Sequence, residues 1–264
     1  MLKLQNVYKT FNKNTVNEKL AINDLSLHLK KGDFVTVIGG NGAGKSTMLN
    51  LIAGVYPPDS GSILLDGEPI TNLPEYKRAK YLGRVFQDPM MGTAANMEIQ
   101  ENLALAYRRG KHRGLKWGIT KEEKQLYMEM LKNLNLGLES RMSTKVGLLS
   151  GGQRQALTLL MATLQQPKLL LLDEHTAALD PKTAERVLEL TQQIVTANSL
   201  TTLMVTHNMK HAIQYGNRLI MMYDGRILLD IEGEAKQKLT VEDLLQRFGR
   251  ASGEDFANDR VLLS

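Results

Sequence analysis

The stretch 39-GGNGAGKST-47 constrains the fold more than any other part of this sequence. It follows a compact apolar run, Phe34–Ile38, which predicts a buried strand, and it opens a helical pattern at Lys45–Ala53. The spacing fits G-x-x-x-x-G-K-[ST], a loop whose glycines let the backbone curl until successive N–H groups point at phosphate oxygens. The positive end of the following helix strengthens this field. A strand, this loop and a helix therefore predict an α/β fold that holds a phosphate-bearing ligand.

The residues of this loop have distinct expected roles. Lys45 reaches the β- and γ-phosphates of a nucleotide, and the Ser46 hydroxyl can ligate Mg²⁺. The alternative, a glycine-rich turn before an ordinary helix, does not explain the complete spacing. The residues expected to contact the nucleotide are Gly39, Asn41, Gly42, Ala43, Gly44, Lys45, Ser46 and Thr47.

A second apolar run, 168-KLLLLDE-174, ends in two adjacent acids. Consecutive leucines are typical of a strand buried on both faces of a parallel sheet. The two carboxylates repel each other and are costly to bury without a positive partner. A magnesium nucleotide at the carboxyl edge of the sheet supplies that charge. We therefore expect Asp173 to hold the water shell of the metal and Glu174 to polarise an attacking water as general base. Without the loop, a solvated acid pair would be a fair alternative.

Strand and helix patterns alternate along the chain, which favours a parallel sheet with right-handed crossovers. Strands are predicted at 2–11, 22–29, 34–38, 169–172 and 201–206, hairpins at 62–70 and 219–230, and helices at 45–53, 98–107, 121–136, 153–164, 181–197 and 240–248. The predicted class is α/β: a P-loop NTPase core with a parallel sheet, an antiparallel β edge and an inserted helical subdomain. The core covers about 1–87 and 150–233, the helical subdomain about 88–149, and a short extension 234–264.

Length and composition exclude several classes of protein. The 264 residues suffice for one α/β domain with a small subdomain. The chain has no cysteine, which excludes disulfides and thiolate metal sites and fits a reducing compartment. We find neither a signal-peptide core nor an apolar run near the roughly 18 residues of a membrane helix, so a cytoplasmic location is expected. The net charge of +5 suits an anionic ligand without demanding nucleic acid.

The motif Leu149-Ser150-Gly151-Gly152-Gln153 precedes an apolar-faced helix. Ser150 is a plausible N-cap, and the glycines expose the first N–H groups of the helix to an anion. Alone, this motif would equally suit a flexible hinge. Together with the loop and the leucine strand, it makes the chain resemble the ATPase subunit of ABC transporters over nearly its whole length. The resemblance implies a head-to-tail dimer of two copies, with each ATP held between one copy's phosphate loop and the other copy's Ser150, Gly151, Gly152 and Gln153.

Further roles follow from the resemblance alone. Phe11 matches the aromatic residue that stacks on adenine, with Tyr8 as a second candidate. Gln87, in 85-VFQDP-89, matches the glutamine that senses magnesium and the water and links to the helical subdomain. His207 resembles the switch histidine that contacts the γ-phosphate. Residues 177–180 resemble the loop that touches the partner copy.

The resemblance breaks at His175, where the family usually has proline. One interpretation is a tolerated loop substitution. The other is a histidine that titrates near pH 6–7 and tunes the contact between the two copies.

Three classes of ABC protein compete. A fused exporter half needs membrane spans, and DNA-repair or translation relatives need coiled coils, zinc modules or a second cassette. The chain shows none of these, so the resemblance implies a separate transporter subunit at the cytoplasmic face of the membrane. Its partners would be an integral membrane permease and, indirectly, an extracytoplasmic solute-binding protein, with no nucleic acid. The sequences of 85–110 and 173–183 resemble those of ABC ATPases that serve importers of small solutes such as amino acids. The alternative is a non-transport ABC ATPase acting on nucleic acid or ribosomes.

The segment 108-RRGKHRGLKWG-118 is basic. It is either a solvated loop or a surface for anionic headgroups or the permease, whose cytoplasmic helix is expected in a groove near Gln87–Thr93. The second interpretation predicts that reversing Arg108, Arg109 and Arg113 to glutamate weakens association with permease or liposomes.

Overall fold

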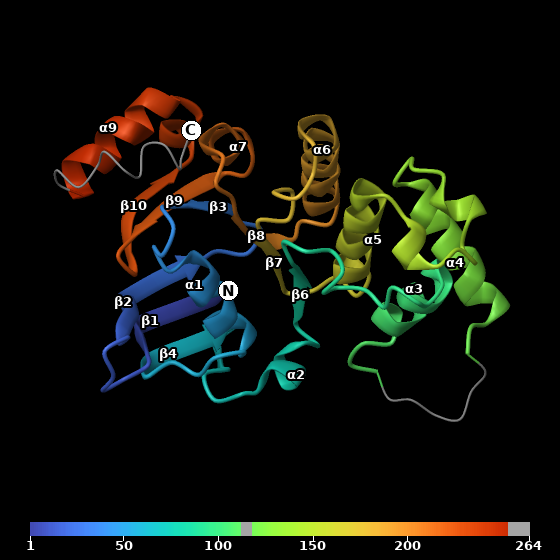
Figure 1. Cartoon of the computed structure of the whole chain (residues 1–264), viewed down its shortest axis with the longest axis horizontal. Coiled ribbons are helices and arrows are strands. Elements are labelled where there is room, and N and C mark those ends of the chain that lie inside the picture. The colour runs from blue at the N-terminus through green and yellow to red at the C-terminus, as the bar shows by residue number, and fades with distance from the viewer. Residues whose placement is uncertain (112–117, 253–264) are drawn as a thin grey trace. The chain divides into compact units, whose positions relative to one another are not determined.

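The computed structural model describes residues 1–111 and 118–252, and the chain divides into two compact units (Figure 1). The first unit comprises Met1–Arg78 and Leu200–Ser264, and the second comprises Ala79–Ser199. Each unit contains strands that end beside candidate functional residues.

The first unit contains an antiparallel sheet in the order β2-β1-β4-β5. Its strands are β1 (Leu2–Phe11), β2 (Lys19–Leu29), β4 (Ser60–Leu65) and β5 (Glu68–Pro69). Leu2, Leu4 and Val7 are buried while the residues between them are mostly exposed, which is the alternation expected of a sheet with one covered face. This sheet is the predicted antiparallel edge.

The first unit also contains parallel strands. Strand β3 (Phe34–Ile38) lies between β8 (Thr201–Val205) and β9 (Arg218–Tyr223) and runs parallel to both; β10 (Arg226–Glu232) pairs antiparallel with β9. Every residue of β3 and β8 is buried, as in a strand covered on both faces.

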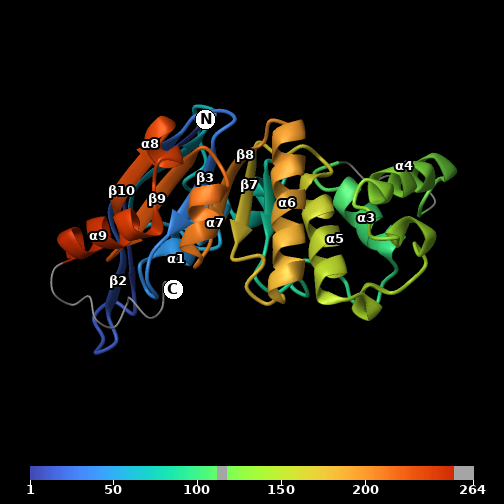
Figure 2. The same ribbon diagram turned by 90° about the horizontal axis from the view of Figure 1, so that it is seen from above.

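Helices cover these parallel strands. Helix α1 (Lys45–Ala53) follows β3, while α7 (Met209–Gln214), α8 (Glu234–Gln237) and α9 (Val241–Ser252) come later in the chain (Figure 2). Ile38, Met221 and Ile231 of the strands pack with Met209 of α7 and Phe248 of α9 in one apolar cluster. A short helix, α2 (Glu75–Arg78), ends the first segment of this unit.

The second unit contains a pair of parallel strands and a helical cluster. Strand β6 (Leu82–Val85) pairs with β7 (Leu169–Asp173), and Val85 lies opposite Leu172. The helices are α3 (Ile99–Tyr107), α4 (Lys121–Lys132), α5 (Gly151–Thr163) and α6 (Pro181–Ala197), with 3₁₀ turns at Leu138–Ser140 and Val146–Leu148.

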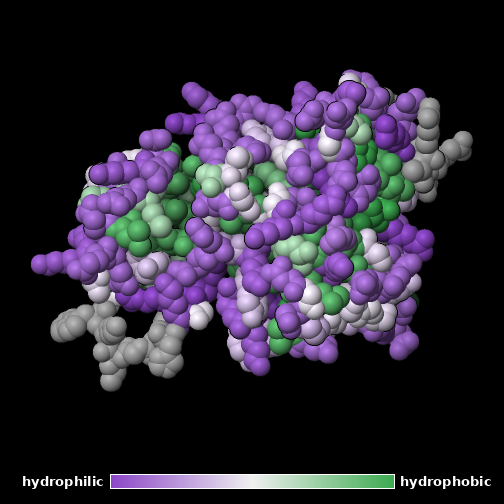
Figure 3. Space-filling view, turned by 180° about the vertical axis from the view of Figure 1, so that it is seen from behind, coloured by the Kyte–Doolittle hydropathy of each residue, from purple (hydrophilic) through white to green (hydrophobic). Residues whose placement is uncertain are grey.

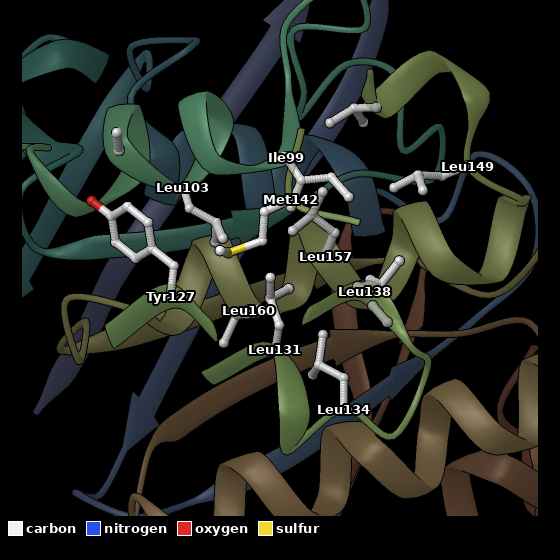
Figure 4. Packing of buried hydrophobic residues seen from close by; sticks show 13 residues of the cluster. Ile99, Leu103, Tyr127, Leu131, Leu134, Leu138, Met142, Leu149, Leu157 and Leu160 are labelled. Atoms are coloured by element: carbon white, nitrogen blue, oxygen red, sulfur yellow. The ribbon is translucent and has the colours of Figure 1, made fainter. Parts of the chain in front are cut away.

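A separate hydrophobic core holds α3, α4 and α5 together. Leu103 of α3, Tyr127 and Leu131 of α4, and Leu157 and Leu160 of α5 meet in it (Figure 4). All five are less than one-tenth exposed, so this part of the chain has a core of its own.

Most predicted elements are confirmed, and the predicted α/β class with parallel and antiparallel strands is correct. The helices at 45–53 and 181–197 and the strands at 2–11 and 34–38 have the predicted bounds. The sequence analysis missed β6, α2, α7 and α8, which are short. The predicted 121–136 helix ends earlier, at Lys132, and Asn135 has a φ of +54°, which a right-handed helix cannot include.

The surface is mostly hydrophilic, with smaller hydrophobic patches, on the face that Figure 3 shows. Within 1–111 and 118–252, no helix combines the length and the apolar character that crossing a membrane requires. Most of the predicted basic segment, 112–117, and most of the predicted tail, 253–264, lie outside the described residues.

Candidate functional site

The glycine loop that joins β3 to α1 is in close contact with neighbouring backbone. A Cβ atom on Gly39 would lie 2.4 Å from the Met222 carbonyl oxygen, and one on Gly44 would lie 2.6 Å from that of Ala21. Gly44 also has a φ of +97°, which L side chains rarely adopt. Only glycine fits these two positions, so the loop keeps its curled path between the strands.

Lys45 is 5% exposed, and its Nζ atom donates hydrogen bonds to the carbonyl oxygens of Gly39 at 2.7 Å and Gly40 at 3.0 Å. The ammonium group is therefore held across the loop, beside the N-terminus of α1. Phosphate oxygens that entered the loop would meet both this cation and the positive end of the helix.

A second cation, which the sequence analysis did not single out, lies beside the same loop. The Nζ atom of Lys19 is 3.0 Å from the position that a Cβ on Gly42 would take. Lys19 begins β2 and lies opposite Phe11 in the register of β1 and β2.

Phe11, the predicted adenine-stacking residue, makes an edge contact with Tyr56 at 5.2 Å between ring centroids. The register thus places Phe11 opposite Lys19, the lysine beside the phosphate loop, on neighbouring strands. Tyr8 lies opposite Ser60 on the other side of β1.

His207 follows β8, the strand adjacent to β3. Val37 lies opposite Val205, and the Thr206 N–H donates to the Val37 carbonyl at 3.0 Å. The parallel register places His207 and the glycine loop at the same ends of neighbouring strands. Asn208 caps α7 by accepting from the His211 N–H at 3.1 Å, which holds the turn that carries His207.

In the second unit, β6 and β7 bring Gln87 and Asp173 to a common edge. Gln87 lies two residues beyond Val85, and Asp173 directly follows Leu172, its partner in register. An arginine on β6 pairs with the acid: Arg84 Nη2 lies 3.7 Å from Asp173 Oδ2, and both side chains are largely buried. The guanidinium of Arg84 also lies 4.5 Å from the centroid of the Phe86 ring. The sequence analysis named only the magnesium nucleotide as the positive partner of Asp173 and missed Arg84.

Glu174 has an unusual backbone conformation. Its φ is +47°, a region that favours glycine, asparagine and aspartate, and its carbonyl accepts from the Ala177 N–H at 2.9 Å. Such a conformation costs on the order of 1–3 kcal/mol and is concentrated at functional sites. The turn changes the chain direction directly after Asp173, so the two acids do not follow the simple alternation of a strand.

The glycine motif before α5 forms a capping box. Ser150 Oγ accepts from the Gln153 N–H at 3.3 Å, and Gln153 Oε1 accepts from the Ser150 N–H at 3.2 Å. Arg154 supports the preceding turn through bonds to the carbonyls of Val146, Gly147 and Leu149. The predicted N-cap role of Ser150 is confirmed.

The two glycines of this motif also allow helix packing. A Cβ on Gly152 would lie 2.3 Å from Cγ2 of Thr183 in α6, whereas one on Gly151 would lie 3.2 Å from Cδ2 of Leu179. Glycine at position 152 is therefore required for α6 to pack this closely against α5. The sequence alone does not reveal this packing constraint.

His175 lies in the interior of the second unit. It is 2% exposed, its Nε2 atom is 3.1 Å from Thr191 Oγ1, and burial lowers its pKa to about 4. The interpretation that His175 titrates near pH 6–7 and tunes a contact between copies is therefore wrong. Its role is to pack the turn after Glu174 against α6.

Arg108 and Arg109 also serve contacts within this unit. Arg108 Nη2 pairs with Glu123 Oε2 at 2.7 Å, and Arg109 Nη2 donates to the Ala162 carbonyl at 3.2 Å. Reversing both charges would break these contacts, so the triple reversal suggested by the sequence cannot isolate membrane or permease association. Arg113, its third residue, lies outside the described residues.

The residues present fit a magnesium nucleotide. Gly39 and Gly44 allow the loop its curled path against the neighbouring backbone, where Cβ atoms would collide, and Lys45 supplies the cation that phosphates require. In the described part of the chain, no group of three or more His, Asp or Glu side chains could hold a metal ion.

The comparison with protein families decides the identity. The family model for ABC transporters matches residues 22–177. The chain belongs to the ABC transporter family. It is an ABC ATPase, the ATP-binding and ATP-hydrolysing subunit of a transporter, and its cofactors are ATP and Mg²⁺.

Individual relatives agree with this assignment. The chain is 48% identical over 248 residues to a tyrosine transport ATP-binding protein of Clostridioides difficile (strain R20291), covering 94% of this chain and 98% of that protein. It is 34% identical over 252 residues to the methionine import ATP-binding protein MetN of Streptococcus pneumoniae (strain ATCC BAA-255 / R6), covering 91% of this chain and 68% of the relative.

A solved structure agrees as well. The dimeric ATP-binding cassette MJ0796, in a post-hydrolysis state bound to ADP and Pi, matches with a TM-score of 0.75 at 32% identity, covering 88% of this chain and 98% of that one. The comparisons support dimerisation and a transporter context for this ABC ATPase.

Proposed function

We propose that this ABC ATPase powers the import of an amino acid, with tyrosine as the first candidate. The observation that carries the proposal is 48% identity, over nearly the whole length of both chains, to a protein named for tyrosine transport. The relative named for methionine import supports the broader class of substrate. The cassette itself does not touch the transported solute, so its own side chains carry no argument about which amino acid is moved.

We further propose the roles of the site residues. Lys45 and the loop residues Gly39, Asn41, Gly42, Ala43, Gly44 and Thr47 bind the phosphates of ATP, and Phe11 stacks on the adenine. Ser46, Gln87 and Asp173 hold the metal and its water shell. ATP with Mg²⁺ supplies the phosphoryl group and the neutralising charge.

Glu174 accepts a proton from the attacking water, and His207 contacts the γ-phosphate. The strained backbone of Glu174 supports this role, because it aims the second acid away from the strand that carries Asp173. Two copies close head to tail, and Ser150, Gly151, Gly152 and Gln153 of one copy contact the nucleotide of the other.

The partners follow from the same proposal. A core of about 1–87 and 150–233 binds the nucleotide, and a helical subdomain of about 88–149 passes its motion to an integral membrane permease that docks near Gln87–Thr93. This places the protein at the cytoplasmic face of the membrane. An extracytoplasmic solute-binding protein delivers the solute to the permease, and nucleic acid is not a partner.

Glu174→Gln tests the catalytic part of the proposal. The variant should retain ATP binding, lose at least 100-fold in turnover and form an ATP-dependent dimer visible by light scattering. Glu185→Gln, an exposed change on α6, is the matched control and should hydrolyse ATP at the normal rate. Normal turnover by Glu174→Gln would remove Glu174 as the base.

Uptake of labelled amino acids tests the substrate. Cells that lack this chain should lose uptake of tyrosine, and the intact gene but not its Lys45→Ala variant should restore it. Normal tyrosine uptake in the deleted cells would contradict tyrosine as the substrate, and loss of uptake of another amino acid would identify that one instead.

A further inference from the structure

A pocket of about 330 Å³ in the second unit contains none of the residues assigned above to nucleotide binding. Strand β6, helices α3 and α5, and the segment after Gln87 line it; the lining includes Arg84, Gly92, Leu105, Arg109, Thr158 and Met161. Two arginines line this pocket, and no acidic side chain of the described residues does. The charged side chains that line it are therefore all positive.

Arg109 is a half-buried cation with few partners among the described residues. Its Nη2 atom donates to the Ala162 carbonyl at 3.2 Å, and its Nε atom is buried and makes no hydrogen bond within the part of the chain that the structure describes. No carboxylate of the described residues lies within ion-pair distance of it. Burial lowers the pKa of Arg109, because the charged guanidinium has lost part of its solvation.

Other arginines of this chain show how a largely buried guanidinium is normally satisfied. Arg78 is 1% exposed and donates to four carbonyl oxygens, those of Leu51, Ile52, Thr71 and Leu73. Arg108, the immediate neighbour of Arg109, forms an ion pair with Glu123. Arg109 has neither arrangement, although a guanidinium carries five N–H donors and a buried polar group without a partner is costly.

We propose that this pocket binds an oxyanion, a carboxylate or a phosphate, on the guanidinium of Arg109. The planar fork of an arginine matches the paired oxygens of both groups, and the pocket is large enough for either. Arg84 supplies the second positive charge at the wall of the pocket while pairing with Asp173. A neutral apolar ligand would leave the half-buried Arg109 charge without a counter-charge, and a cation would be repelled.

Through Arg84, an anion bound in the pocket would affect Asp173. Arg84 lines the pocket and also lies 3.7 Å from Asp173, so one side chain borders both places. An oxyanion in the pocket would attract this guanidinium and weaken its pairing with Asp173. The anion pocket itself does not depend on the roles proposed for the nucleotide residues.

The experiment titrates the full chain carrying Lys45→Ala, in which phosphate binding by the glycine loop is removed. Sodium phosphate and sodium acetate are added separately at constant ionic strength, and the thermal unfolding midpoint and the NMR signal of the Arg109 Nε–H group are followed. We expect a saturable rise of the midpoint with at least one anion, together with a shift of that Nε–H signal. A response to acetate identifies carboxylate chemistry, and a response to phosphate alone identifies phosphate chemistry.

Arg109→Met in the same background should reduce the anion affinity at least tenfold. Arg108→Met is the matched control: it removes the adjacent arginine, which is already paired with Glu123, and should keep the anion response. If Arg109→Met does not fold, the Nε–H signal in the parent chain still decides the question. The proposal is overturned if neither anion gives a saturable response, or if Arg109→Met responds like its parent.

Discussion

The Nε2 atom of His175 lies 3.1 Å from Thr191 Oγ1, and the same hydroxyl donates to the Val187 carbonyl at 2.7 Å. Because the hydroxyl hydrogen is used toward Val187, the oxygen of Thr191 accepts from His175. Nε2 of the imidazole therefore carries a proton, and because burial lowers the pKa of His175 to about 4, the ring is neutral at pH 7. Because a buried neutral histidine resists protonation, the free energy of unfolding falls as the pH is lowered.

The pH dependence follows from the two pKa values of His175. Burial lowers the pKa to about 4 from the ordinary 6.5, so between these values the unfolded chain binds more protons than the folded chain. Stability therefore falls as the pH drops from 7 to 5, by about 2 kcal/mol for this group alone. Urea unfolding of wild type and His175→Gln at both pH values measures it. The variant should lack that share of the loss, and equal losses in both proteins would contradict a buried neutral His175.

Gly152→Ala should destabilise the folded state by about 1–3 kcal/mol, because the added methyl group collides with Cγ2 of Thr183. Thr183→Ser removes that methyl group and keeps the hydroxyl, so the double variant should recover most of the loss. Denaturant unfolding of the four proteins gives the coupling free energy. Additive effects of the two substitutions would show that this contact does not limit the packing of α5 on α6.

Lys19→Ala should weaken ATP binding by about 3–10-fold, and more at low salt, because the ammonium lies beside the phosphate loop at Gly42. Lys45→Ala should abolish tight binding. Lys13→Ala, which removes an exposed lysine paired with Asp59, is the control and should bind normally. Isothermal titration measures all three. Unchanged affinity of Lys19→Ala would exclude Lys19 from the nucleotide site.

Arg84→Met should lower the free energy of unfolding in the absence of nucleotide by about 1–3 kcal/mol, since it leaves Asp173 without this partner. Saturating ATP with Mg²⁺ should reduce that deficit, because the metal replaces the lost positive charge. Arg84→Lys keeps a charge and should lose less. A deficit that is the same with and without Mg²⁺ and nucleotide would separate Asp173 from the metal.

Sequence reasoning succeeded where local signals decide the structure. The glycine loop, the leucine strand and the cap at Ser150 are each determined by residues within a few positions of one another. Strand β6 escaped detection because Leu82–Val85 is four residues long and contains glycine and arginine, so it shows neither alternation nor a continuous apolar run.

The missed contacts join residues that are far apart in the sequence. Arg84 meets Asp173 only because β6 pairs with β7, and Lys19 meets Gly42 only because the register places the start of β2 beside the loop. The burial of His175 likewise depends on Thr191, one helix further along the chain. None of these pairings leaves a periodic signal in the sequence, so tertiary structure is needed to see them.

The central claim is that the glycine loop and the acid pair hold the same magnesium nucleotide. A crystal structure of Glu174→Gln grown with ATP and Mg²⁺ tests it most directly. We predict that Lys45 Nζ contacts the β- and γ-phosphates of the nucleotide whose metal is bound by Ser46 and by the water shell that Asp173 holds. Lys45 and Asp173 facing separate cavities, with the metal held by neither Ser46 nor Asp173, would contradict the account.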